Sequence, residues 1–443
     1  MTPDESLAYL YRLQQFGIKL GLDKVRELLQ RLGNPQDGLR CLHVAGTNGK
    51  GSVSVLLAEI LRHAGHCVGL YTSPHLHCFT ERVRINGEPL TLDQLPPLVE
   101  RLRAASFGLP VTFFEAATAL ALLAFRKAGV TVAVLETGMG GRLDATNVVT
   151  PELCLITPVS LDHQEHLGET LAAIAAEKAG IIKPGVAVVS GVQEPEAAEI
   201  IAAVAARCGA QLWQAGRDFS WGGDREGMWL RAPGVALDGL SCALPGAHQL
   251  DNYAQALAGA ACLRQDGWQL PESALRRAGL TARWPGRLEW WGEPPVVLLD
   301  GAHNVAGAAA LARYLTETTA RPVRLVAGLS GQRRPDAVLA PLRGRLRALY
   351  ATAVPEGATV PPADLVTWAQ QAELAARAFP APDQALAAAL AEREAGEVVV
   401  VAGSLYLVAA VRALLFGGGT ERTIGVGTSP QHAARECGCK VSA

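Results

Sequence analysis

A glycine-rich loop between a short apolar strand and a long helical pattern is the feature that most constrains how this chain can fold. The loop reads Gly46-Thr47-Asn48-Gly49-Lys50-Gly51-Ser52 and lies between the apolar run Cys41–Ala45 and the helical pattern Gly51–Ala64. At such a junction, backbone N–H groups, the positive end of the helix dipole and the lysine all point at one anion. A hydroxyl after the lysine, here Ser52, is placed to hold Mg²⁺. The loop therefore predicts a site for nucleotide phosphates.

The loop departs from the common P-loop in its last positions. That motif ends Gly-Lys-Ser/Thr, whereas Gly51 separates Lys50 from Ser52 here, and Val44 stands where the usual GTPase or kinase pattern has a glycine. A glycine turn without a ligand is the alternative interpretation, and the lysine and hydroxyl in this strand–helix context disfavour it. The variant loop also disfavours a generic motor or switch protein.

Short β-branched runs alternate with helical patterns through the first half of the chain. The expected strands are Cys41–Ala45, Cys67–Tyr71, Val130–Glu136, Leu153–Thr157 and Val186–Ser190. The expected helices are Gly51–Ala64, Leu92–Ala105, Glu115–Ala128, Thr170–Ala179 and Pro195–Cys208. This alternation is typical of an α/β fold, in which a mostly parallel sheet carries helices on both faces.

The pattern changes in the second half. Residues 213–244 are rich in glycine and turn residues, which indicates β-hairpins, and a helix follows over His248–Gln265. A second α/β series is expected over Val296–Asp300, Val305–Thr318, Val323–Ala327, Ala348–Ala353, Glu397–Ala402 and Leu405–Leu415. We therefore expect a first domain over 1–284, a linker over 285–295, a smaller Rossmann-like α/β domain over 296–416 and a flexible tail over 417–443.

Composition argues against several classes of protein. The chain carries 40 basic and 42 acidic residues, whereas a nucleic-acid-binding protein would need a basic excess. Its N-terminus lacks the apolar core of a signal peptide, and runs such as Ala119 to Phe125 are far short of the ~20 apolar residues that span a bilayer. The nine cysteines are scattered, and Cys437 and Cys439 have no second pair to complete a zinc site. We expect reduced thiols in a cytoplasmic protein that binds neither nucleic acid nor membrane.

A series of further motifs follows the loop in order over most of the chain. They are Thr72-Ser73-Pro74-His75-Leu76, Glu81-Arg82-Val83-Arg84-Ile85, the stretch from Glu136 to Asn147, Ser160-Leu161-Asp162-His163, Glu177-Lys178-Ala179-Gly180-Ile181, Arg283-Trp284-Pro285-Gly286-Arg287, Asp300-Gly301-Ala302-His303-Asn304 and Gly403-Ser404-Leu405-Tyr406. With the loop, this series resembles the folylpolyglutamate synthase/dihydrofolate synthase family, a branch of the Mur ligases. The resemblance implies a ligase that uses ATP to phosphorylate the carboxylate of a reduced folate, and then lets the amine of L-glutamate attack the acyl phosphate.

The resemblance also implies which residues hold metal and phosphate. Ser73, Glu136 and His163 would hold a Mg²⁺ ion, Ser52 would serve the Mg²⁺ bound to ATP, and Lys50 would pair with the phosphates. Hydroxyl and carboxylate oxygens suit Mg²⁺, whereas histidine is a less typical ligand. Glu136 ends an apolar strand, at the edge where open α/β sheets bind ligands. Taken alone, His163 is more often a hydrogen-bonded loop residue than a ligand.

Lys178 is the least conventional member of the implied site. A lysine beside Glu177 on a helix is usually solvated or ion-paired. The matching lysine of the family is carbamylated, which replaces a cation by an acidic oxygen ligand near the metal. The resemblance therefore implies a carbamylated Lys178 among the catalytic residues Lys50, Glu136, His163 and Lys178.

Two segments are implied to contact the pterin of the substrate. They are Thr112-Phe113-Phe114-Glu115 and, within the loop after Glu136, Arg142-Leu143-Asp144-Ala145. An aromatic side chain in the first segment can pack on a flat ring. A connecting loop made of turn residues is the alternative for the second segment. Thr137 stands where many relatives have valine, and we expect this change to matter little.

The second half supplies the implied nucleotide contacts Asn252, Arg287 and Asp300, with His303 as a weaker candidate. An amide can read adenine or ribose, a guanidinium pairs with phosphate, and a carboxylate accepts from ribose hydroxyls. A helix cap for Asn252 and a linker salt bridge for Arg287 are the alternatives. Because these residues come from both expected domains, ATP is expected in an interdomain cleft that closes to complete the site.

Alternatives remain open at this point. A peptidoglycan-type Mur ligase acting on a UDP-sugar peptide shares the loop, but such enzymes usually carry an extra N-terminal domain, and residues 16–22 resemble the folate branch. A regulatory ATP-binding protein without catalysis is disfavoured by the intact Glu136, His163 and Lys178. Within the folate branch, we expect a monomer that acts on dihydropteroate as well as on tetrahydrofolate.

Overall fold

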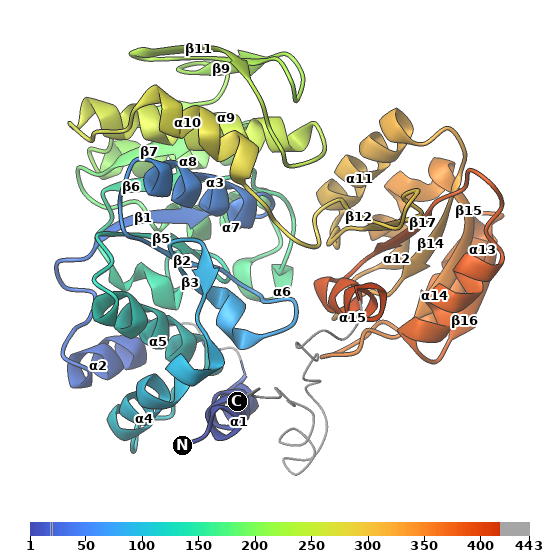
Figure 1. Ribbon diagram of the computed structural model, residues 1–443, viewed down its shortest axis with the longest axis horizontal. Helices are drawn as coiled ribbons and strands as arrows, with labels where there is room; N and C mark the ends of the chain where they lie inside the picture. The colour runs from blue at the N-terminus through green and yellow to red at the C-terminus, as the bar shows by residue number, and fades with distance from the viewer. Residues whose placement is uncertain (18, 20, 417–443) are drawn as a thin grey trace. The chain divides into compact units, whose positions relative to one another are not determined.

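The computed structural model describes residues 1–17, 19 and 21–416, which form two compact units (Figure 1). The first unit comprises Met1–His75 and Phe79–Trp284, and the second comprises Leu76–Cys78 and the chain from Pro285 onward. Positions 18 and 20, the expected tail over 417–443 and the cysteines at 437 and 439 lie outside the described residues.

The first unit is built around an eight-stranded sheet in the order β4-β3-β2-β5-β1-β6-β7-β8. The strands are β1 (Arg40–Ala45), β2 (Val68–Tyr71), β3 (Val83–Ile85), β4 (Glu88–Pro89), β5 (Val132–Glu136), β6 (Leu153–Ile156), β7 (Ala187–Ser190) and β8 (Leu212–Gln214). From β2 to β8 in this order the strands run parallel, while β3 and β4 add antiparallel pairings at one edge. The central strands are buried on both faces, which is why they are nearly continuous apolar runs in the sequence.

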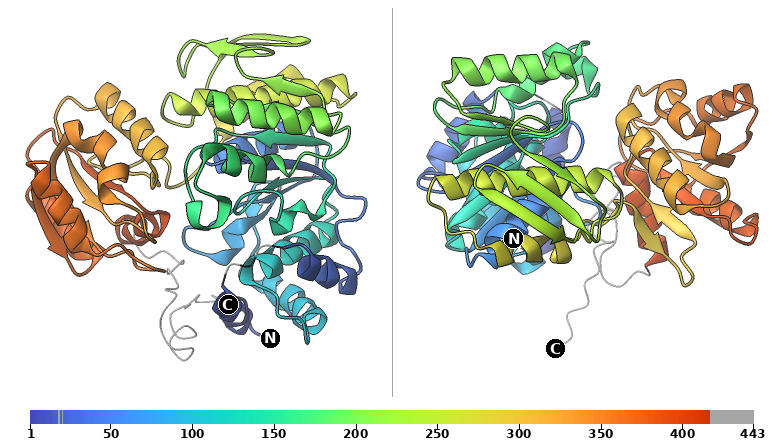
Figure 2. Two further views of the ribbon diagram at one scale, coloured as in Figure 1. Left: turned by 180° about the vertical axis from the view of Figure 1, so that it is seen from behind. Right: turned by 90° about the horizontal axis from the view of Figure 1, so that it is seen from above.

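Helices cover both faces of this sheet (Figures 1 and 2). One face carries α3 (Lys50–His63), α9 (His248–Gln265) and α10 (Glu272–Thr281), and a small antiparallel sheet of β9 (Ser220–Gly222), β10 (Met228–Ala232) and β11 (Val235–Leu240) packs outside α9. The other face carries α5 (Phe113–Lys127), α7 (Leu171–Ala179) and α8 (Pro195–Arg207), and α5 is packed in turn by α1 (Pro3–Arg12), α2 (Asp23–Arg31) and α4 (Leu95–Ala105). Short helical turns are η1 (Leu13–Phe16), η2 (Phe79–Arg82), η3 (Leu92–Gln94), η4 (Ala145–Val148) and α6 (Gln164–Leu167).

Alternate residues of each strand point to opposite faces, so one strand serves two cores. In β1, Leu42 and Val44 join the core beneath α3 and α9, whereas Ala45 joins the core beneath α7 and α8. Gly69 of β2 lies under α5, where a Cβ would come within 2.7 Å of the Phe125 ring. The helices are therefore held close to the sheet, and the loops between them leave at its edges.

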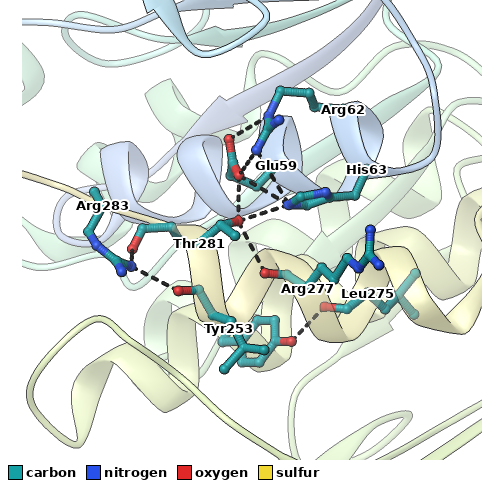
Figure 3. Close-up of polar contacts among 10 residues, drawn as sticks. Glu59, Arg62, His63, Tyr253, Leu275, Arg277, Thr281 and Arg283 are labelled. Atoms are coloured by element: carbon teal, nitrogen blue, oxygen red, sulfur yellow. Dashed lines mark hydrogen bonds and ion pairs between the residues drawn. The ribbon is translucent and has the colours of Figure 1, made fainter.

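The helix that follows the glycine-rich loop is anchored at its far end (Figure 3). Thr281, the last residue of α10, donates through Oγ1 to Glu59 Oε2 at 2.5 Å, and His63 Nε2 lies 2.9 Å from the same hydroxyl. Arg62 adds two hydrogen bonds to the Glu59 carboxylate. These contacts tie α3 to α10 and leave the other end of α3 for the loop.

The second unit holds a six-stranded sheet in the order β12-β13-β17-β14-β15-β16, parallel except for β12. Its strands are β12 (Glu289–Trp291), β13 (Val297–Leu299), β14 (Val323–Ala327), β15 (Leu346–Thr352), β16 (Ala375–Phe379) and β17 (Val399–Ala402). Its helices are α11 (Val305–Thr318), α12 (Pro335–Val338), η5 (Ala340–Arg345) and α13 (Pro362–Gln371) on one face, and α14 (Pro382–Ala391) and α15 (Leu405–Leu415) on the other. Leu76 packs against the core between the sheet and the helices α14 and α15, and Arg412 Nη1 lies 3.0 Å from His77 Nε2. These contacts explain why the short segment Leu76–Cys78 belongs to the second unit.

The expected fold class is confirmed: both units are α/β, with a large, mostly parallel sheet in the first and a smaller mixed sheet in the second. The expected strands and helices of the first half lie within a few residues of the observed ones. Two expectations differ from the structure. Residues 212–214 form β8 of the main sheet instead of a hairpin, and the expected linker contains β12, which pairs with β13. Both strands have three residues and lie at sheet edges, so their sequences carry little periodicity.

Two further features concern the apolar character of the helices and the state of the cysteines. No described helix is long and apolar enough to cross a lipid bilayer. The cysteines within the described residues, at positions 41, 67, 78, 154, 208, 242 and 262, are free thiols.

Candidate active site

The ends of several strands meet at the carboxyl edge of the first sheet. β1 pairs with β5 on one side and with β6 on the other, so that Val44 lies opposite Glu136 and Ala45 lies opposite Ile156. β2 pairs with β5 further along the same edge, and the chain after Tyr71 therefore leaves the sheet near Glu136. The loops that follow these strands converge at the edge where open α/β sheets bind ligands.

The glycine-rich loop rests on the chain that follows β6. Thr47 N–H donates to Pro158 O at 3.0 Å, and Thr47 Oγ1 donates to Ser160 O at 3.1 Å. Asn48 Nδ2 donates to Ser160 Oγ at 3.2 Å. Gly46 has a φ of 145°, and a Cβ at this position would lie 1.8 Å from Thr157 Oγ1. Only a glycine allows this approach, so Gly46 determines how deeply the loop is seated.

The loop ends where α3 begins. Gly49 precedes the helix in a left-handed conformation (φ 90°), and no side chain caps the helix. Its first N–H groups therefore remain available to an anion. Lys50 Nζ donates to Thr47 O at 3.1 Å, so the lysine side chain folds back on the loop. Ser52 is buried in the first turn of the helix.

Asn252 of α9 lies against this loop. A Cβ on Gly49 would be 2.3 Å from Asn252 Oδ1, and Asn252 Nδ2 donates to Gln249 Oε1 at 2.9 Å. The N-cap residue of α9 is Ala247, so Asn252 is not a helix cap. Its amide is held beside the phosphate loop instead.

The additional glycine of the loop has a packing reason. A Cβ on Gly51 would lie 2.7 Å from Cζ2 of the Trp284 indole, and Arg84 lies over the same ring system, with Cζ 5.4 Å from its centroid. The first turn of α3 therefore packs directly against an aromatic ring. A serine or alanine at position 51 would require that ring to move.

Ser73 and Glu136, two of the three implied Mg²⁺ ligands, are brought together. Ser73 N–H donates to Glu136 Oε2 at 3.1 Å, and the Glu136 side chain is buried. This contact is made by the backbone of Ser73, and a carboxylate and a serine hydroxyl are the kinds of hard oxygen donor that suit Mg²⁺. His163 follows β6 in a left-handed conformation (φ 52°) with a side chain that is 40% exposed, 4.0 Å from Glu165. Among the described residues, no cluster of three or more His, Cys, Asp or Glu side chains could hold a metal ion.

Lys178 lies on the opposite side of the loop from α3. Its Nζ donates to Gly46 O at 2.7 Å, and the residue is only 4% exposed. Burial, together with the nearby positive charge of Lys50, lowers the pKa of Lys178 to about 7. This lowered pKa favours the uncharged, nucleophilic form of the amine relative to an exposed lysine.

Asp144 holds the loop that follows β5. Its Oδ2 accepts from the N–H groups of Gly138 and Met139 at 2.9 and 3.0 Å, and its Oδ1 accepts from Thr146 N–H and Oγ1. Burial raises the pKa of this carboxyl group. Both carboxylate oxygens thus accept hydrogen bonds from the loop itself, and the expected contact of Asp144 with substrate stays a prediction.

A buried histidine supports the same loop. Thr146 Oγ1 gives its proton to Asp144, so the partner nitrogen, His43 Nε2 at 2.8 Å, must be the donor in that contact. Complete burial, with Lys183 nearby, lowers the pKa of His43 to about 3. His43 is therefore neutral and carries its proton on Nε2. No sequence motif marks His43 as a functional residue, because it lies within an apolar strand and resembles a core position.

Some polar atoms near this loop have no partner. His43 Nδ1, Thr137 Oγ1 and Asn147 Oδ1 are buried without a hydrogen bond among the described residues. Thr137 was expected to be a harmless substitute for valine. Its buried hydroxyl carries a desolvation cost of about 1–3 kcal/mol that valine would not carry.

The implied pterin segment before α5 is partly a helix cap. Thr112 N–H donates to Glu115 Oε2 at 2.6 Å, and Glu115 N–H donates to Thr112 Oγ1 at 3.3 Å, which is a capping box. Phe114 packs on Gly138, where a Cβ would lie 2.5 Å from the ring. Phe113 is stacked with Tyr11. Of the second segment, Ala145 is buried and Leu143 is partly buried, whereas Arg142 is exposed and pairs with Glu177 at 2.7 Å.

The remaining implied nucleotide residues belong to the second unit. Asp300 follows β13 and accepts from Leu288 N–H and Ala302 N–H at 3.0 and 2.9 Å. His303 Nδ1 lies 2.7 Å from Gly301 O. Arg287 makes no hydrogen bond or ion pair with any described residue, so the alternative of a linker salt bridge is not observed among them. Its guanidinium remains available to an anion.

Comparisons with known proteins show the family to which the chain belongs. Residues 44–260 match the family described as the Mur ligase middle domain, and residues 286–405 match the Mur ligase glutamate ligase domain. The folylpolyglutamate synthase of Lacticaseibacillus casei is 37% identical over 441 residues, which cover 94% of this chain and 100% of that protein. The dihydrofolate synthase/folylpolyglutamate synthase of Escherichia coli strain K12 is 36% identical over 413 residues, 91% of this chain and 93% of that protein.

Solved structures give the same result. The E. coli FolC complex with DHPP and ADP has a TM-score of 0.85 at 31% identity, covering 93% of this chain and 97% of that one. An FPGS–AMPPCP–folate complex has a TM-score of 0.82 at 35% identity, covering 94% of this chain and all of that one.

The phosphate loop, the buried lysine and the two matched domains define an ATP-dependent ligase of the Mur type. Within that class, the chain belongs to the folylpolyglutamate synthase/dihydrofolate synthase family.

The contact between Gly49 and Asn252 can be tested with Gly49→Ala. We expect a loss of about 1 kcal/mol from the positive φ and a further 1–3 kcal/mol from the collision with Asn252, together with weaker binding of a non-hydrolysable ATP analogue. Gly65→Ala is the matched control, because Gly65 has a φ of 91° and no neighbour within 4 Å of a built Cβ. Chemical denaturation and analogue titration would measure both variants, and equal effects would contradict the loop packing described above.

The neutral state of His43 predicts an acid dependence of stability. Between about pH 6.5 and pH 3 the unfolded chain binds a proton at this residue that the folded protein does not bind. Its contribution therefore makes the free energy of unfolding fall as the pH falls through this window, with a slope of up to about 1.4 kcal/mol per pH unit. His43→Gln should flatten that slope while exposed His166→Gln should not, as measured by urea denaturation at several pH values. An unchanged slope in His43→Gln would show that the histidine is protonated in the folded state.

Proposed function

We propose that this chain joins L-glutamate to the carboxylate of a folate at the expense of ATP, through an acyl phosphate. The observation that carries the proposal is the convergence at one sheet edge of an uncapped helix start, Lys50, the Ser73–Glu136 pair and Lys178. The helix start and the lysines can bind and neutralise phosphate, the Ser73–Glu136 pair can hold a metal ion, and none of these groups forms a covalent bond with a substrate in the proposed reaction. Such a site suits transfer of a phosphoryl group between bound substrates, in which positioning and charge stabilisation do most of the work.

The chemistry runs in two steps. The folate carboxylate attacks the γ-phosphorus of ATP, which releases ADP and leaves a mixed anhydride of carboxylate and phosphate. The uncharged amine of glutamate then attacks the carbonyl carbon, the amine proton is lost, and inorganic phosphate leaves as the amide forms. The loop N–H groups and Lys50 hold the transferred phosphate, and the residues that contact the nucleotide are Asn252, Arg287, Asp300 and His303.

Mg²⁺ would be held by Ser73, Glu136 and His163, with Ser52 serving the metal that accompanies ATP. When bound, it would neutralise phosphate charge during the transfer. The Ser73 and Glu136 oxygens fit such an ion.

Carbamylation of Lys178 is supported by its chemistry. Reaction with carbon dioxide requires an uncharged amine, and the lowered pKa of this lysine supplies one at neutral pH. A carbamate nitrogen keeps one hydrogen, so the hydrogen bond to Gly46 O would survive. The product would also replace a cation that is disfavoured by burial beside Lys50 with an anion.

The second substrate, the oligomeric state and the location of the protein are proposed from its family. The chain also accepts dihydropteroate, in keeping with relatives named dihydrofolate synthase, and acts as a monomer in the cytoplasm without nucleic-acid or membrane partners. A Mur-type ligase for a UDP-sugar peptide is the alternative activity.

One assay separates these activities. Purified protein is given ATP and Mg²⁺ with tetrahydrofolate, dihydropteroate or a UDP-sugar peptide, each with and without glutamate, and ADP is measured. ADP release that requires both a pteridine substrate and glutamate is expected. Turnover with the UDP-sugar peptide, or without glutamate, would overturn the folate assignment.

The phosphate role of Lys50 is tested by Lys50→Ala. We expect kcat to fall by at least about 100-fold, because a preorganised positive charge at the transferred phosphate is lost, while the melting temperature stays near that of the parent. Lys127→Ala, at the exposed end of α5, is the control. Near-normal turnover in Lys50→Ala would refute the assignment of the loop.

The carbamate is tested by carbon-13 NMR of protein equilibrated with labelled bicarbonate. A protein-bound carbamate resonance is expected in the parent chain and is expected to disappear in Lys178→Met. Lys183→Met is the matched control, because Lys183 is also partly buried with a lowered pKa but donates to Asn147 O. A spectrum without this resonance, or a resonance that survives in Lys178→Met, would rule out the modification at this lysine.

A further inference from the structure

The turn that carries Ser73 is contacted by the first helix of the chain. Tyr11, in the last turn of α1, has its hydroxyl 3.3 Å from His75 Nε2. On the other side of the same imidazole, Arg82 Nε donates to His75 Nδ1 at 2.7 Å. His75 is two residues after Ser73, whose N–H donates to Glu136. A hydrogen-bonded path therefore runs from α1 to the turn that meets Glu136.

The direction of each hydrogen bond follows from the arginine. A guanidinium N–H can only donate, so His75 Nδ1 must be the acceptor and carries no proton. The neutral imidazole then carries its proton on Nε2, which donates to the Tyr11 hydroxyl oxygen. The tyrosine is therefore an acceptor that orients the imidazole, a role that phenylalanine cannot fill.

The ring of Tyr11 contacts the second element of the site. It is stacked with Phe113, with centroids 6.0 Å apart and planes 11° from parallel. Phe79 meets Phe113 edge-on at 5.9 Å, and the Arg82 guanidinium lies 5.1 Å from the Phe113 centroid. The helix start that the family resemblance assigns to pterin binding and the Ser73 turn thus share their supports, and Tyr11 is the one that comes from α1.

We propose that Tyr11 is a positioning residue for the ligase reaction, because its hydroxyl fixes His75 and with it the Ser73–His75 turn against Glu136, while its ring fixes Phe113. It acts through His75 and Phe113, so its loss affects use of the folate and Mg²⁺ more than use of ATP. The kinetic part of this inference rests on the proposed function, whereas the structural part does not.

The chain offers a matched pair of variants. Tyr11→Phe removes the hydroxyl contact with His75 and keeps the ring beside Phe113. Tyr9→Phe removes a hydroxyl from the same helix, where it lies 2.8 Å from Ser106 Oγ, away from the turn. Both lose one tyrosine contact of α1, so a general weakening of the helix would affect them equally.

The first measurement is hydrogen exchange of the peptide covering residues 72–76, in protein without metal or substrate. Loss of one such contact is expected to speed exchange of the turn about 3- to 10-fold in Tyr11→Phe and to leave it unchanged in Tyr9→Phe. In a His75→Ala background, Tyr11→Phe should add no further change, because the hydroxyl acts through the imidazole. Unchanged exchange in Tyr11→Phe, or equal changes in both tyrosine variants, would overturn the proposal even if the enzyme is a folate ligase.

The second measurement is steady-state kinetics. Tyr11→Phe should raise KM for folate and the half-saturating Mg²⁺ concentration about 3- to 10-fold and leave KM for ATP unchanged, whereas Tyr9→Phe should match the parent. An equal rise for all three would indicate a general structural effect and contradict a positioning role. If the parent shows no folate-dependent turnover, the proposed function fails, and the exchange result still decides whether Tyr11 holds the turn.

Discussion

The close approach between the end of β1 and the chain after β6 is the constraint on which the rest of the site depends. Gly46 sits where a Cβ would overlap Thr157, and its carbonyl oxygen accepts from the buried ammonium of Lys178. Because the loop is held this deeply, the start of α3 faces the carboxyl edge of the sheet with its N–H groups uncapped. The far end of α3 is tied to α10, so the loop has a rigid base.

The deep seating of the glycine-rich loop brings positively charged side chains close together at the carboxyl edge of the sheet. Burial, together with the nearby positive charge of Lys50, lowers the pKa of Lys178 to about 7. The buried Glu136 provides the opposite charge at the adjacent strand end. A site in which charges are buried and incompletely balanced is stabilised by a phosphate and a divalent cation, which is why substrates are needed to complete it. The same arrangement explains why no enzyme nucleophile is required for amide formation.

Much of the fold could be predicted from the sequence, because the buried parallel strands are continuous apolar runs and α11, β14 and α15 begin and end where the patterns indicate. Short edge strands such as β8 and β12 could not, because three residues carry no usable periodicity. The phosphate loop and the end of β5 at Glu136 were visible as local motifs. The roles assigned to individual residues of the loop after β5 were less predictable, since whether Asp144 faces a substrate or its own backbone depends on how that loop closes.

Contacts between distant segments were beyond prediction from the sequence. Tyr11 looks like one more core residue of an amphipathic helix, and its neighbours His75 and Phe113 are 64 and 102 positions away in the sequence. Likewise, His43 is one residue of a buried strand until Thr146 is placed beside it. Side chains of this kind acquire a function only from tertiary packing, so no local pattern marks them.

Tracing the oxygen atoms of the folate carboxylate tests the central claim, transfer of a phosphoryl group to that carboxylate, most directly. Folate labelled with oxygen-18 in the reacting carboxyl group is incubated with the protein, ATP, Mg²⁺ and glutamate, and the released phosphate is examined by mass spectrometry. The account predicts ADP and inorganic phosphate that carries one labelled oxygen per amide bond formed. Unlabelled phosphate, or release of AMP and pyrophosphate, would contradict it.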